Sequence, residues 1–364
     1  MKTLSILGTR PELIKMSEII KKLDKYTEHT FVHTGQNYDY ELNEVFYGDL
    51  GLRKPDHFLS VAGDSLGETI GNVLFEVEKM LKLYEPDAVI ILGDTNSALG
   101  GIIAKRMKIP LFHLEAGNRC FDDNVPEEIN RKIMDHISDI NMAYTENSRQ
   151  YLLDEGVAKS RIFIMGSPMK EVFKQHLSKI MRSTIVEELG LDGYFLVSIH
   201  RDENTEIPAN LDILCDTLNA IVEKYDIPIV LTAHPRLRKK LDERNIALDP
   251  RIRVCKPFGF IDYNKLQLNA KCVISDSGTI AEESSILKFP AITIRNAIER
   301  PEAVDVGSIL MTGVDKENIL NCLDIVTAPT TIPADYDVDN CSDRVLKVVL
   351  GFTPYVNKYV WRKR

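Results

Sequence analysis

The 364-residue sequence has no apolar run as long as about 18 residues, which excludes an ordinary membrane-spanning helix. It has no run of about five lysines or arginines, and 54 acidic residues outnumber 45 basic ones, so no nucleic-acid partner is expected. Its six cysteines are well separated and form no C-x-x-C pair, which indicates neither a disulfide framework nor a zinc site. The N-terminus enters a strand-like segment without a secretion signal. Together these absences predict a cytoplasmic protein with reduced thiols and no membrane insertion.

Two nucleotide-binding fingerprints are also missing. No G-x-G-x-x-G follows a strand candidate, and no G-x-x-x-x-G-K-[ST] occurs anywhere in the chain. The sequence therefore indicates neither a bound nicotinamide nor P-loop chemistry. We expect no cofactor and no metal.

What is present is a globular composition, with 44% hydrophobic and 27% charged residues, in a repeating strand, turn and helix pattern. This alternation is typical of an α/β protein with parallel sheets. The strand candidates are 3–7, 30–33, 88–92, 111–114, 140–144, 162–165, 195–199, 227–231, 251–254, 272–275 and 291–294. The helix candidates of the first half are 11–24, 65–83, 97–107, 127–137 and 146–154.

The strand series stops near residue 165 and restarts near residue 195, with a polar, weakly periodic join at 167–189. Two doubly wound domains explain this break. Ligands of such domains bind beyond the carboxyl ends of the strands, so the chemically active residues are expected just after strands.

The first strand ends in Gly-Thr-Arg-Pro-Glu at 8–12, which places Arg10 and Lys15 at a helix N-terminus, where anions bind. The alternative is a plain turn with Lys15 facing solvent. The strand at 88–92 delivers Asp94 to the same edge, although an Asp there can also be only the N-cap of the next helix.

Two further carboxylates belong to this edge. Glu115 closes a strand and Glu127 opens a helix, so together with Asp94 they are expected to converge. Converging carboxylates repel one another, which raises one pKa and provides a general acid and a general base. For one of Glu127 and Glu128, favourable interaction with the helix macrodipole is the simpler explanation.

In the second half, His200 and His234 each follow a strand, and Ser-Asp-Ser-Gly-Thr at 275–279 opens a helix that carries Glu282 and Glu283. Small residues at a helix start form a phosphate cradle, which here predicts a diphosphate held without a Walker lysine. The alternative for each histidine is a buried structural role.

These motifs together resemble the non-hydrolysing UDP-N-acetylglucosamine 2-epimerase family. The resemblance implies a glycosyltransferase-B fold, in which two Rossmann-like domains face each other across a cleft. The domains would be 1–168, joined by a C-terminal helix at 344–364, and 169–343. The motifs are Gly-Thr-Arg-Pro-Glu at 8–12 with Lys15, Thr-Gly-Gln at 34–36, Gly-Asp-Thr at 93–95, His-Leu-Glu-Ala-Gly at 113–117, Pro-Glu-Glu-Ile-Asn-Arg at 126–131, His200-Arg201, His234-Pro235, Ser-Asp-Ser-Gly at 275–278 with Glu282-Glu283, and Glu-Arg-Pro-Glu at 299–302.

The family pattern also implies site roles, a UDP-sugar as the bound molecule and a homodimer. The implied catalytic residues are Asp94, Glu115, Glu127, His200 and Lys15. The implied UDP-sugar-binding residues are Arg10, Arg119, His234, Phe258, Ser277, Gly278, Thr279, Glu283 and Arg300.

Two segments depart from the commonest family pattern. Residues 118–122 read Asn-Arg-Cys-Phe-Asp where Leu-Arg-Thr is usual, and His200-Arg201 is followed by Asp202 instead of a second arginine. The first departure resembles the subgroup that converts UDP-2-acetamido-2,6-dideoxy-L-talose to UDP-N-acetyl-L-fucosamine for surface polysaccharides. The second puts the family's additional effector site in doubt.

The chemistry constrains how such an epimerase works. The C2–H bond of an N-acetylhexosamine has no neighbouring carbonyl, so direct proton abstraction is excluded. Breaking the C1–O bond acidifies C2–H, and elimination of UDP then gives a 2-acetamidoglycal to which UDP is added back. Four alternatives remain open: epimerisation of UDP-N-acetylglucosamine to UDP-N-acetylmannosamine, a hydrolysing epimerase, a UDP-sugar glycosyltransferase and a non-catalytic UDP-sugar sensor.

Overall fold

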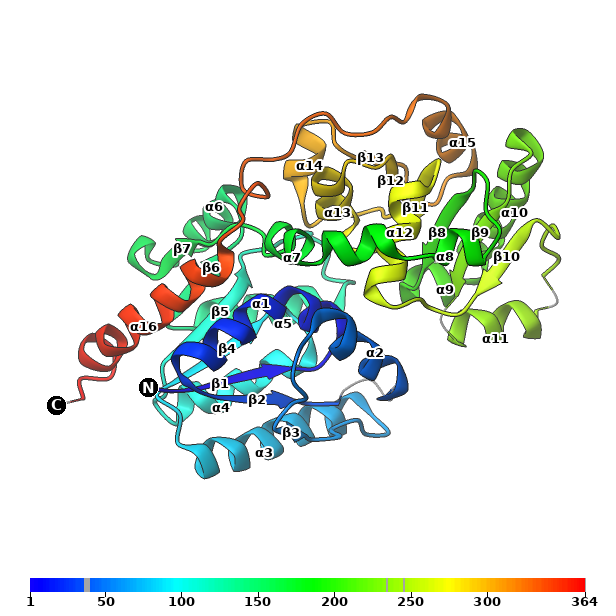
Figure 1. The fold of residues 1–364 in the computed structure, drawn as a ribbon. Coiled ribbons are helices and arrows are strands. Elements are labelled where there is room, and N and C mark those ends of the chain that lie inside the picture. Colours follow the sequence, from blue (N-terminus) through cyan, green and yellow to red (C-terminus); the bar gives the residue numbers. More distant parts are fainter. Residues whose placement is uncertain (36–39, 234, 245, 364) are drawn as a thin grey trace. The chain divides into compact units, whose positions relative to one another are not determined.

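The computed structural model describes residues 1–35, 40–233, 235–244 and 246–363 (Figure 1). The chain forms two compact units, which we call unit 1, Met1–Gln175 with Ala334–Arg364, and unit 2, His176–Pro333. The sequence analysis placed the boundaries at 168/169 and 343/344, and the compact units divide instead after Gln175 and after Pro333. Unit 1 is therefore discontinuous in sequence, with unit 2 inserted into it.

Unit 1 is built on a parallel sheet with the strand order β3-β2-β1-β4-β5-β6-β7. Its strands are β1 (Lys2–Leu7), β2 (Glu28–His33), β3 (His57–Phe58), β4 (Ala88–Leu92), β5 (Leu111–Ala116), β6 (Ile140–Ala143) and β7 (Ile162–Ile164). Its helices are α1 (Arg10–Tyr26), α2 (Tyr40–Leu50), α3 (Leu66–Tyr84), η1 (Asn96–Gly100), α4 (Gly101–Arg106), α5 (Pro126–Ile137), α6 (Glu146–Asp154), η2 (Lys159–Arg161) and α16 (Cys341–Tyr359). The strand order reverses between β1 and β4, so the carboxyl ends of these two strands mark the switch point at which ligands bind in such sheets.

Unit 2 repeats this plan with the strand order β10-β9-β8-β11-β12-β13, again all parallel. Its strands are β8 (Phe195–Ile199), β9 (Ile229–Ala233), β10 (Ile252–Cys255), β11 (Cys272–Ser275), β12 (Ala291–Thr293) and β13 (Leu310–Met311). Its helices are α8 (Ile185–Glu188), α9 (Asp202–Thr205), α10 (Pro208–Tyr225), α11 (Pro235–Glu243), α12 (Phe260–Asn269), α13 (Ile280–Leu287), α14 (Pro301–Asp305) and α15 (Lys316–Ile325). The switch point of this sheet lies between β8 and β11.

The predicted join at 167–189 contains no strand in the structure, but it is largely helical. It holds α7 (Met169–Arg182), in which the boundary between the units falls, and the short α8. The expected helix at 97–107 is divided into η1 and α4. Gly100 and Gly101 stand at the division, where an added Cβ would lie 2.8 Å from Val77 Cγ2 and 2.6 Å from Met134 Cε, respectively. The two glycines therefore allow this segment to pack closely against α3 and α5.

The core of each unit lies between its sheet and the covering helices. In unit 1 every residue of β4 is buried, and Val73 and Val77 of α3 pack on Ile6 and Ile91. Ser65 caps α3 by accepting the N–H of Glu68 at 3.1 Å. The C-terminal helix α16, drawn in red in Figure 1, packs against α1, and Lys22 Nζ lies 2.6 Å from Asp343 Oδ1.

None of the helices in the described part of the chain has both the length and the apolar character of a membrane-crossing segment. All six cysteines are free thiols.

Candidate functional site

The carboxyl end of the unit 1 sheet holds a buried ion pair between Lys15 of α1 and Glu115 of β5. Lys15 Nζ lies 2.8 Å from Glu115 Oε1 and 2.6 Å from Oε2, and the two side chains are each 8% exposed. Burial of two charges is tolerated only when they are well paired, as they are here. The structure thus joins two residues that the sequence analysis placed in the catalytic set.

Glu115 stands on a distorted stretch of β5. The β5–β6 register shifts between Leu114 and Ala116, and Glu115 has φ = 67°, in the left-handed region that a residue with a Cβ rarely adopts. The Asn118 side chain donates to Glu115 Oε1 at 3.2 Å. The bulge therefore re-aims one carboxylate at a strand end, which is a common use of bulges next to active sites.

Asp135 of α5 supports this strand end from within the unit. It accepts the Gly117 N–H at 3.2 Å, and its Oδ1 lies 2.9 Å from His113 Nδ1, while His113 Nε2 lies 2.8 Å from the Gly93 carbonyl oxygen. Burial favours the neutral acid, but His113 and Arg119 outweigh it and lower the pKa of Asp135. At Gly117, where φ is +83°, an added Cβ would lie 2.2 Å from the Ser148 carbonyl oxygen, so only glycine fits.

Arg119 occupies a different position from the one expected of a UDP-sugar ligand. Its side chain is 1% exposed. The guanidinium donates to Asp135 at 2.7 Å and to Glu155 at 2.7 and 2.5 Å. These partners lie 16 and 36 residues further along the chain, so its burial was not apparent from the motif. In this structure Arg119 therefore supports the loop after β5. Its expected contact with a UDP-sugar stays a prediction.

Asp94 follows β4, the neighbour of β5, and pairs with Arg131 of α5. Arg131 Nε donates to Asp94 Oδ2 at 3.0 Å and a second guanidinium nitrogen contacts the same oxygen. The Asn130 side chain donates to the Asp94 carbonyl oxygen at 2.9 Å. Asp94 is therefore held by α5 and is not an N-cap, since Thr95 holds that position before η1.

Glu127 lies in the first turn of α5 and is half-buried. It precedes Arg131 by one helical turn and shares that face of α5, which brings it to the same region as Asp94. Its neighbour Glu128, for which the sequence analysis considered a favourable interaction with the helix macrodipole, is fully buried and bonded to Arg131 at 2.7 Å.

Glu12, which the expected set did not include, is a carboxyl group at this strand end whose pKa is raised. Its oxygens accept from the Gly8 N–H at 2.8 Å and from the hydroxyls of Thr9 and Thr95, each at 2.9 Å. Burial raises the pKa of Glu12 to about 7, against the lowering effect of these donors. The cause is therefore desolvation rather than the repulsion between converging carboxylates that we expected. Arg10, two positions earlier, is half-buried with its guanidinium 5.8 Å from the Phe46 ring centroid.

In unit 2 the switch point is organised by Asp276, which follows β11 and is fully buried. It accepts the N–H groups of His200 and Arg201 at 3.1 and 3.0 Å and the Asn204 side chain at 3.0 Å, and the His200 ring lies 2.9 Å away. Burial opposes ionisation, but His200 and these donors prevail and lower the pKa of Asp276 to about 2. The His200 ring, 47% exposed, is thereby oriented at the carboxyl end of β8.

The predicted phosphate cradle forms a tight turn before α13. The Ser277 hydroxyl lies 3.0 Å from that of Thr279, and the Ser277 N–H donates to Ser275 Oγ at 3.0 Å. An added Cβ at Gly278 would meet Glu299 Oε2 at 3.4 Å and Arg295 Nη1 and Arg300 Nη1 at 3.5 Å, so ion-paired side chains of both signs lie directly beside the turn. A pocket of about 10 Å³ touches this turn, which is room for about one water molecule.

Arg300 lies behind the turn in a buried network and is itself 4% exposed. Its Nε donates to Glu282 at 2.8 Å, and Glu299 accepts from Arg295 at 2.9 Å and from Arg300 at 3.4 Å. The two arginines and the two glutamates thus form a buried network of ion pairs behind the turn.

The remaining candidates of unit 2 are less closely linked to the turn. Glu283 accepts from Gln267 and from the Thr279 hydroxyl, each at 2.6 Å, which connects it to the end of the turn. Phe258 lies half-buried in the segment between β10 and α12. His234 lies outside the described residues.

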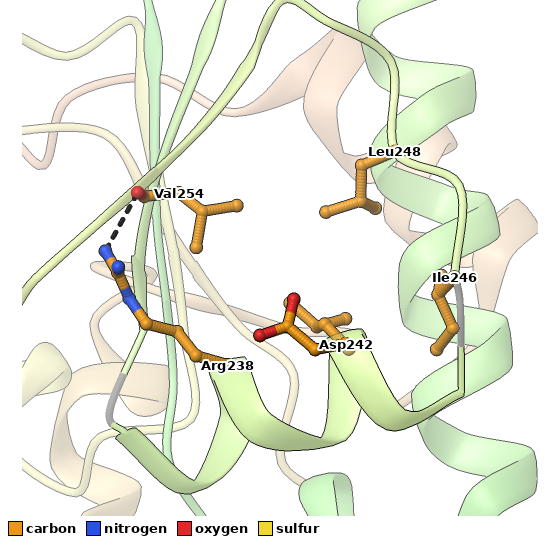
Figure 2. Close-up of a pocket in the computed structure, with 6 residues that line it drawn as sticks. Arg238, Asp242, Ile246, Leu248 and Val254 are labelled. Atoms are coloured by element: carbon orange, nitrogen blue, oxygen red, sulfur yellow. Dashed lines mark hydrogen bonds between the residues drawn. The ribbon is translucent and has the colours of Figure 1, made fainter.

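A pocket of about 240 Å³ lies elsewhere in unit 2, between α11 and β10 (Figure 2). Figure 2 shows the Asp242 carboxylate directed into this space and the Arg238 guanidinium bonded to the Val254 carbonyl oxygen at 2.9 Å. The lining residues are Arg238, Leu241, Asp242, Ile246, Leu248 and Val254. None of them belongs to the expected site.

Comparison with known proteins decides the family. The sequence profile described as UDP-N-acetylglucosamine 2-epimerase matches residues 21–350. The chain belongs to this family. A UDP-N-acetylglucosamine 2-epimerase of Methanocaldococcus jannaschii is 37% identical, over 90% of this chain and 92% of that protein. A UDP-2,3-diacetamido-2,3-dideoxy-D-glucuronate 2-epimerase of Pseudomonas aeruginosa is 33% identical, over 88% and 90%.

Solved structures of the family agree. The structure of UDP-N-acetylglucosamine 2-epimerase from Rickettsia bellii has a TM-score of 0.92 at 45% identity and covers 100% of both chains. That of the M. jannaschii epimerase in complex with UDP-GlcNAc and UDP has a TM-score of 0.89 at 35% identity, over 96% of this chain and 100% of that one. The expected epimerase activity class and the glycosyltransferase-B fold are confirmed.

Within this UDP-N-acetylglucosamine 2-epimerase family member, no group of three histidine, cysteine or acidic residues in the described ranges has the geometry of a metal site. Three buried acids at strand ends or in first helical turns were not in the expected set of site residues. They are Glu12, Glu128 and Asp276. Their signal was present, since each is an acidic residue inside a motif that otherwise reads as a buried turn, but their partners come from distant segments.

Proposed function

We propose that this family member inverts C2 of a UDP-N-acetylhexosamine by eliminating UDP and adding it back. The observation that supports the proposal is that the two switch points carry different kinds of residue. That of unit 1 holds the ion-paired carboxylates Asp94 and Glu115, and that of unit 2 holds an oriented histidine beside a small-residue turn. Acid–base groups and an anion-binding turn are the two things that the reaction requires.

In this mechanism the C1–O bond breaks and UDP leaves with its electron pair, while one carboxylate removes the C2 proton. The resulting 2-acetamidoglycal receives a proton at C2 from the opposite face, and the UDP oxygen re-forms the bond to C1. Asp94, Glu115 and Glu127 serve as the acid–base groups, with the Lys15 ammonium beside Glu115 at 2.6 Å. UDP binds at Ser277, Gly278 and Thr279, with His200, Glu283, Phe258, His234 and Arg10 as further ligands.

The elimination route makes a direct prediction about hydrogen exchange. In deuterated water, with no nicotinamide, metal or acceptor added, the product is expected to carry solvent deuterium at C2. Retention of the original C2 hydrogen in the product, or a strict requirement for added NAD, contradicts the mechanism.

For the sugar, we propose a 6-deoxy substrate of the L-talo type, with UDP-N-acetyl-L-fucosamine as product. The support is the segment after Glu115, in which Phe121 is 69% exposed, has φ = 55° and packs edge-on against Tyr151 at 5.2 Å between ring centroids. An exposed aromatic ring in a strained backbone conformation indicates a contact surface. A C5 methyl group suits that ring, whereas a hydroxymethyl group there leaves a polar group unpaired, at about 1–3 kcal/mol.

The second candidate is epimerisation of UDP-N-acetylglucosamine to UDP-N-acetylmannosamine, because several relatives carry the name of that epimerase. The deciding measurement is kcat/KM for both UDP-sugars on one preparation, with UDP-N-acetylglucosamine also tried as its own activator. Faster turnover of UDP-N-acetylglucosamine refutes the 6-deoxy substrate and leaves the reaction type intact. We also propose that the protein forms a homodimer and lies in the cytoplasm. Measurement of its molecular mass in solution tests the first proposal.

A further inference from the structure

Glu128 makes contacts that go beyond the favourable effect of an acidic residue at a helix N-terminus. Its carboxylate is fully buried in the first turn of α5, and its Oε2 accepts from Arg131 Nη1 at 2.7 Å. The same oxygen accepts the Cys120 N–H at 3.2 Å, and Oε1 accepts the Phe121 N–H at 3.3 Å. One carboxylate thus holds two consecutive backbone donors of the segment that follows Glu115.

Arg131, the partner of Glu128, also bonds the proposed acid–base residue Asp94. Arg131 is 3% exposed, and while Nη1 bonds Glu128, its Nε and second terminal nitrogen bond Asp94. A planar guanidinium that holds two carboxylates fixes their separation and orientation. An unbroken series of contacts therefore connects Asp94, Arg131, Glu128 and the backbone of Cys120 and Phe121.

The simpler explanation is favourable interaction with the macrodipole of α5. Glu146 provides the comparison, because it also lies in the first turn of a helix, α6. Its side chain is 56% exposed and pairs only locally, with Arg149 three residues on. A macrodipole partner can thus remain in solvent. Burying a charged pair costs free energy unless every atom is satisfied, so the buried arrangement indicates a requirement for geometry.

We propose that Glu128 and Arg131 are positioning residues for the reaction. Arg131 sets the place of Asp94, and Glu128 ties Arg131 to the backbone of residues 120 and 121, so that the acid–base group and the segment beside the sugar are held as one body. This rests on the proposed function, since it takes Asp94 as an acid–base group and the 118–122 segment as a sugar contact.

The test compares Glu128→Gln with the control Glu146→Gln, which removes a first-turn carboxylate from a neighbouring helix. For each protein, kcat and KM are measured with both UDP-sugars, and the Kd of UDP is measured by calorimetry. We expect Glu128→Gln to lower kcat by about 10- to 100-fold, because a displacement of about 1 Å can cost about 100-fold in rate. The ratio of kcat/KM between the two sugars should also change, while the Kd of UDP stays within about twofold and Glu146→Gln has no effect.

Three results would overturn the proposal. They are an unchanged kcat, an unchanged ratio between the sugars, or a loss confined to Tm that Glu146→Gln matches. If Glu128→Gln does not fold, Arg131→Lys takes its place, because it keeps the charge but cannot bond both carboxylates in one plane. Wild-type kcat in Arg131→Lys would equally overturn the proposal. Failure of the proposed function is seen separately, as an absence of deuterium exchange at C2 in the wild-type protein.

Discussion

Glu12 in unit 1 and Asp276 in unit 2 occupy corresponding places, and their ionisation differs sharply. Each is a buried carboxyl group that links the ends of the two strands at a switch point. Glu12 connects the turn after β1 to Thr95 after β4, and Asp276 connects the end of β11 to the His200 and Arg201 N–H groups after β8. The pKa of Glu12 is raised to about 7, whereas that of Asp276 is lowered to about 2.

The difference comes from the charge of the partners and not from burial, which favours the neutral acid in both. The donors that act on Glu12 are neutral: the backbone N–H groups of Gly8 and Thr9 and the hydroxyls of Thr9 and Thr95. Asp276 has the His200 ring at 2.9 Å in addition to its N–H donors. In unit 1 the cations Lys15 and Arg131 pair with other carboxylates. Unit 1 thus has the features of an acid–base site and unit 2 those of a rigid binding edge.

The largest expected effect tests the acid–base side of this comparison. Asp94→Asn and Glu115→Gln should each lower turnover by at least about 100-fold, the usual scale for a general acid or base. The Kd of UDP should stay within several fold, because both residues lie in unit 1. Asp123→Asn, at a side chain that is 79% exposed, is the control. Normal turnover in either variant removes that carboxylate from the mechanism.

The binding side is tested at Ser277. We expect Ser277→Asp to abolish UDP binding, since it adds a negative charge to the turn beside Arg300. Ser277→Ala, which removes only the hydroxyl, should bind UDP within several fold of wild type. Calorimetric titration with UDP measures both, and wild-type affinity in Ser277→Asp would place the nucleotide elsewhere.

Glu12→Gln should change how stability depends on pH. A carboxyl whose pKa rises from 4.5 to about 7 on folding binds its proton more tightly in the native state. Its contribution is therefore full below pH 4.5 and is lost as the pH rises to about 7, about 3 kcal/mol in all. Urea unfolding of both proteins between pH 5 and 8 should show the wild type losing stability relative to Glu12→Gln. A constant difference across this range would contradict the raised pKa.

Asp276→Asn should show the opposite slope and a smaller amplitude. The pKa of this carboxyl falls from 3.8 to about 2 on folding, so its contribution is present above pH 3.8 and is lost as the pH falls toward 2. The amplitude is about 2 kcal/mol. Urea unfolding from pH 5 downward should show the wild type approaching Asp276→Asn in stability. If both acids gave slopes of one sign, the contrast between the two switch points would not hold.

Most of the fold was predictable because its strands are short apolar runs bounded by turns, as at 88–92 and 272–275, which match β4 and β11. The two-residue strands β3 and β13 were missed, since they are too short to carry an alternation and form only by pairing at a sheet edge. The division of the expected helix at 97–107 was also missed, because it depends on the packing of Gly100 and Gly101 against other helices.

The residues of the candidate site also fall into those whose placement the sequence predicts and those whose contacts it does not. The placement of Asp94, Glu115 and Ser277 at strand ends was predictable because topology alone brings strand ends to one edge of a sheet. Their roles stay predictions. The buried contacts of Glu128 and Arg119 were not predicted, since they involve partners contributed by another segment. Hydrogen bonds between a helix and a distant loop leave no periodic signal in the sequence.

The insertion of unit 2 into unit 1 also bears on the order of folding during synthesis. Residues 176–333 have all been made before Ala334–Arg364, so unit 2 is the first unit whose sequence is complete. Until then, α1 lacks its cover, because Val345, Val349 and Val356 of α16 are buried only in the finished unit. A chain released shortly after residue 333 would thus have a completed unit 2 and an exposed apolar face on α1, and would be prone to aggregation.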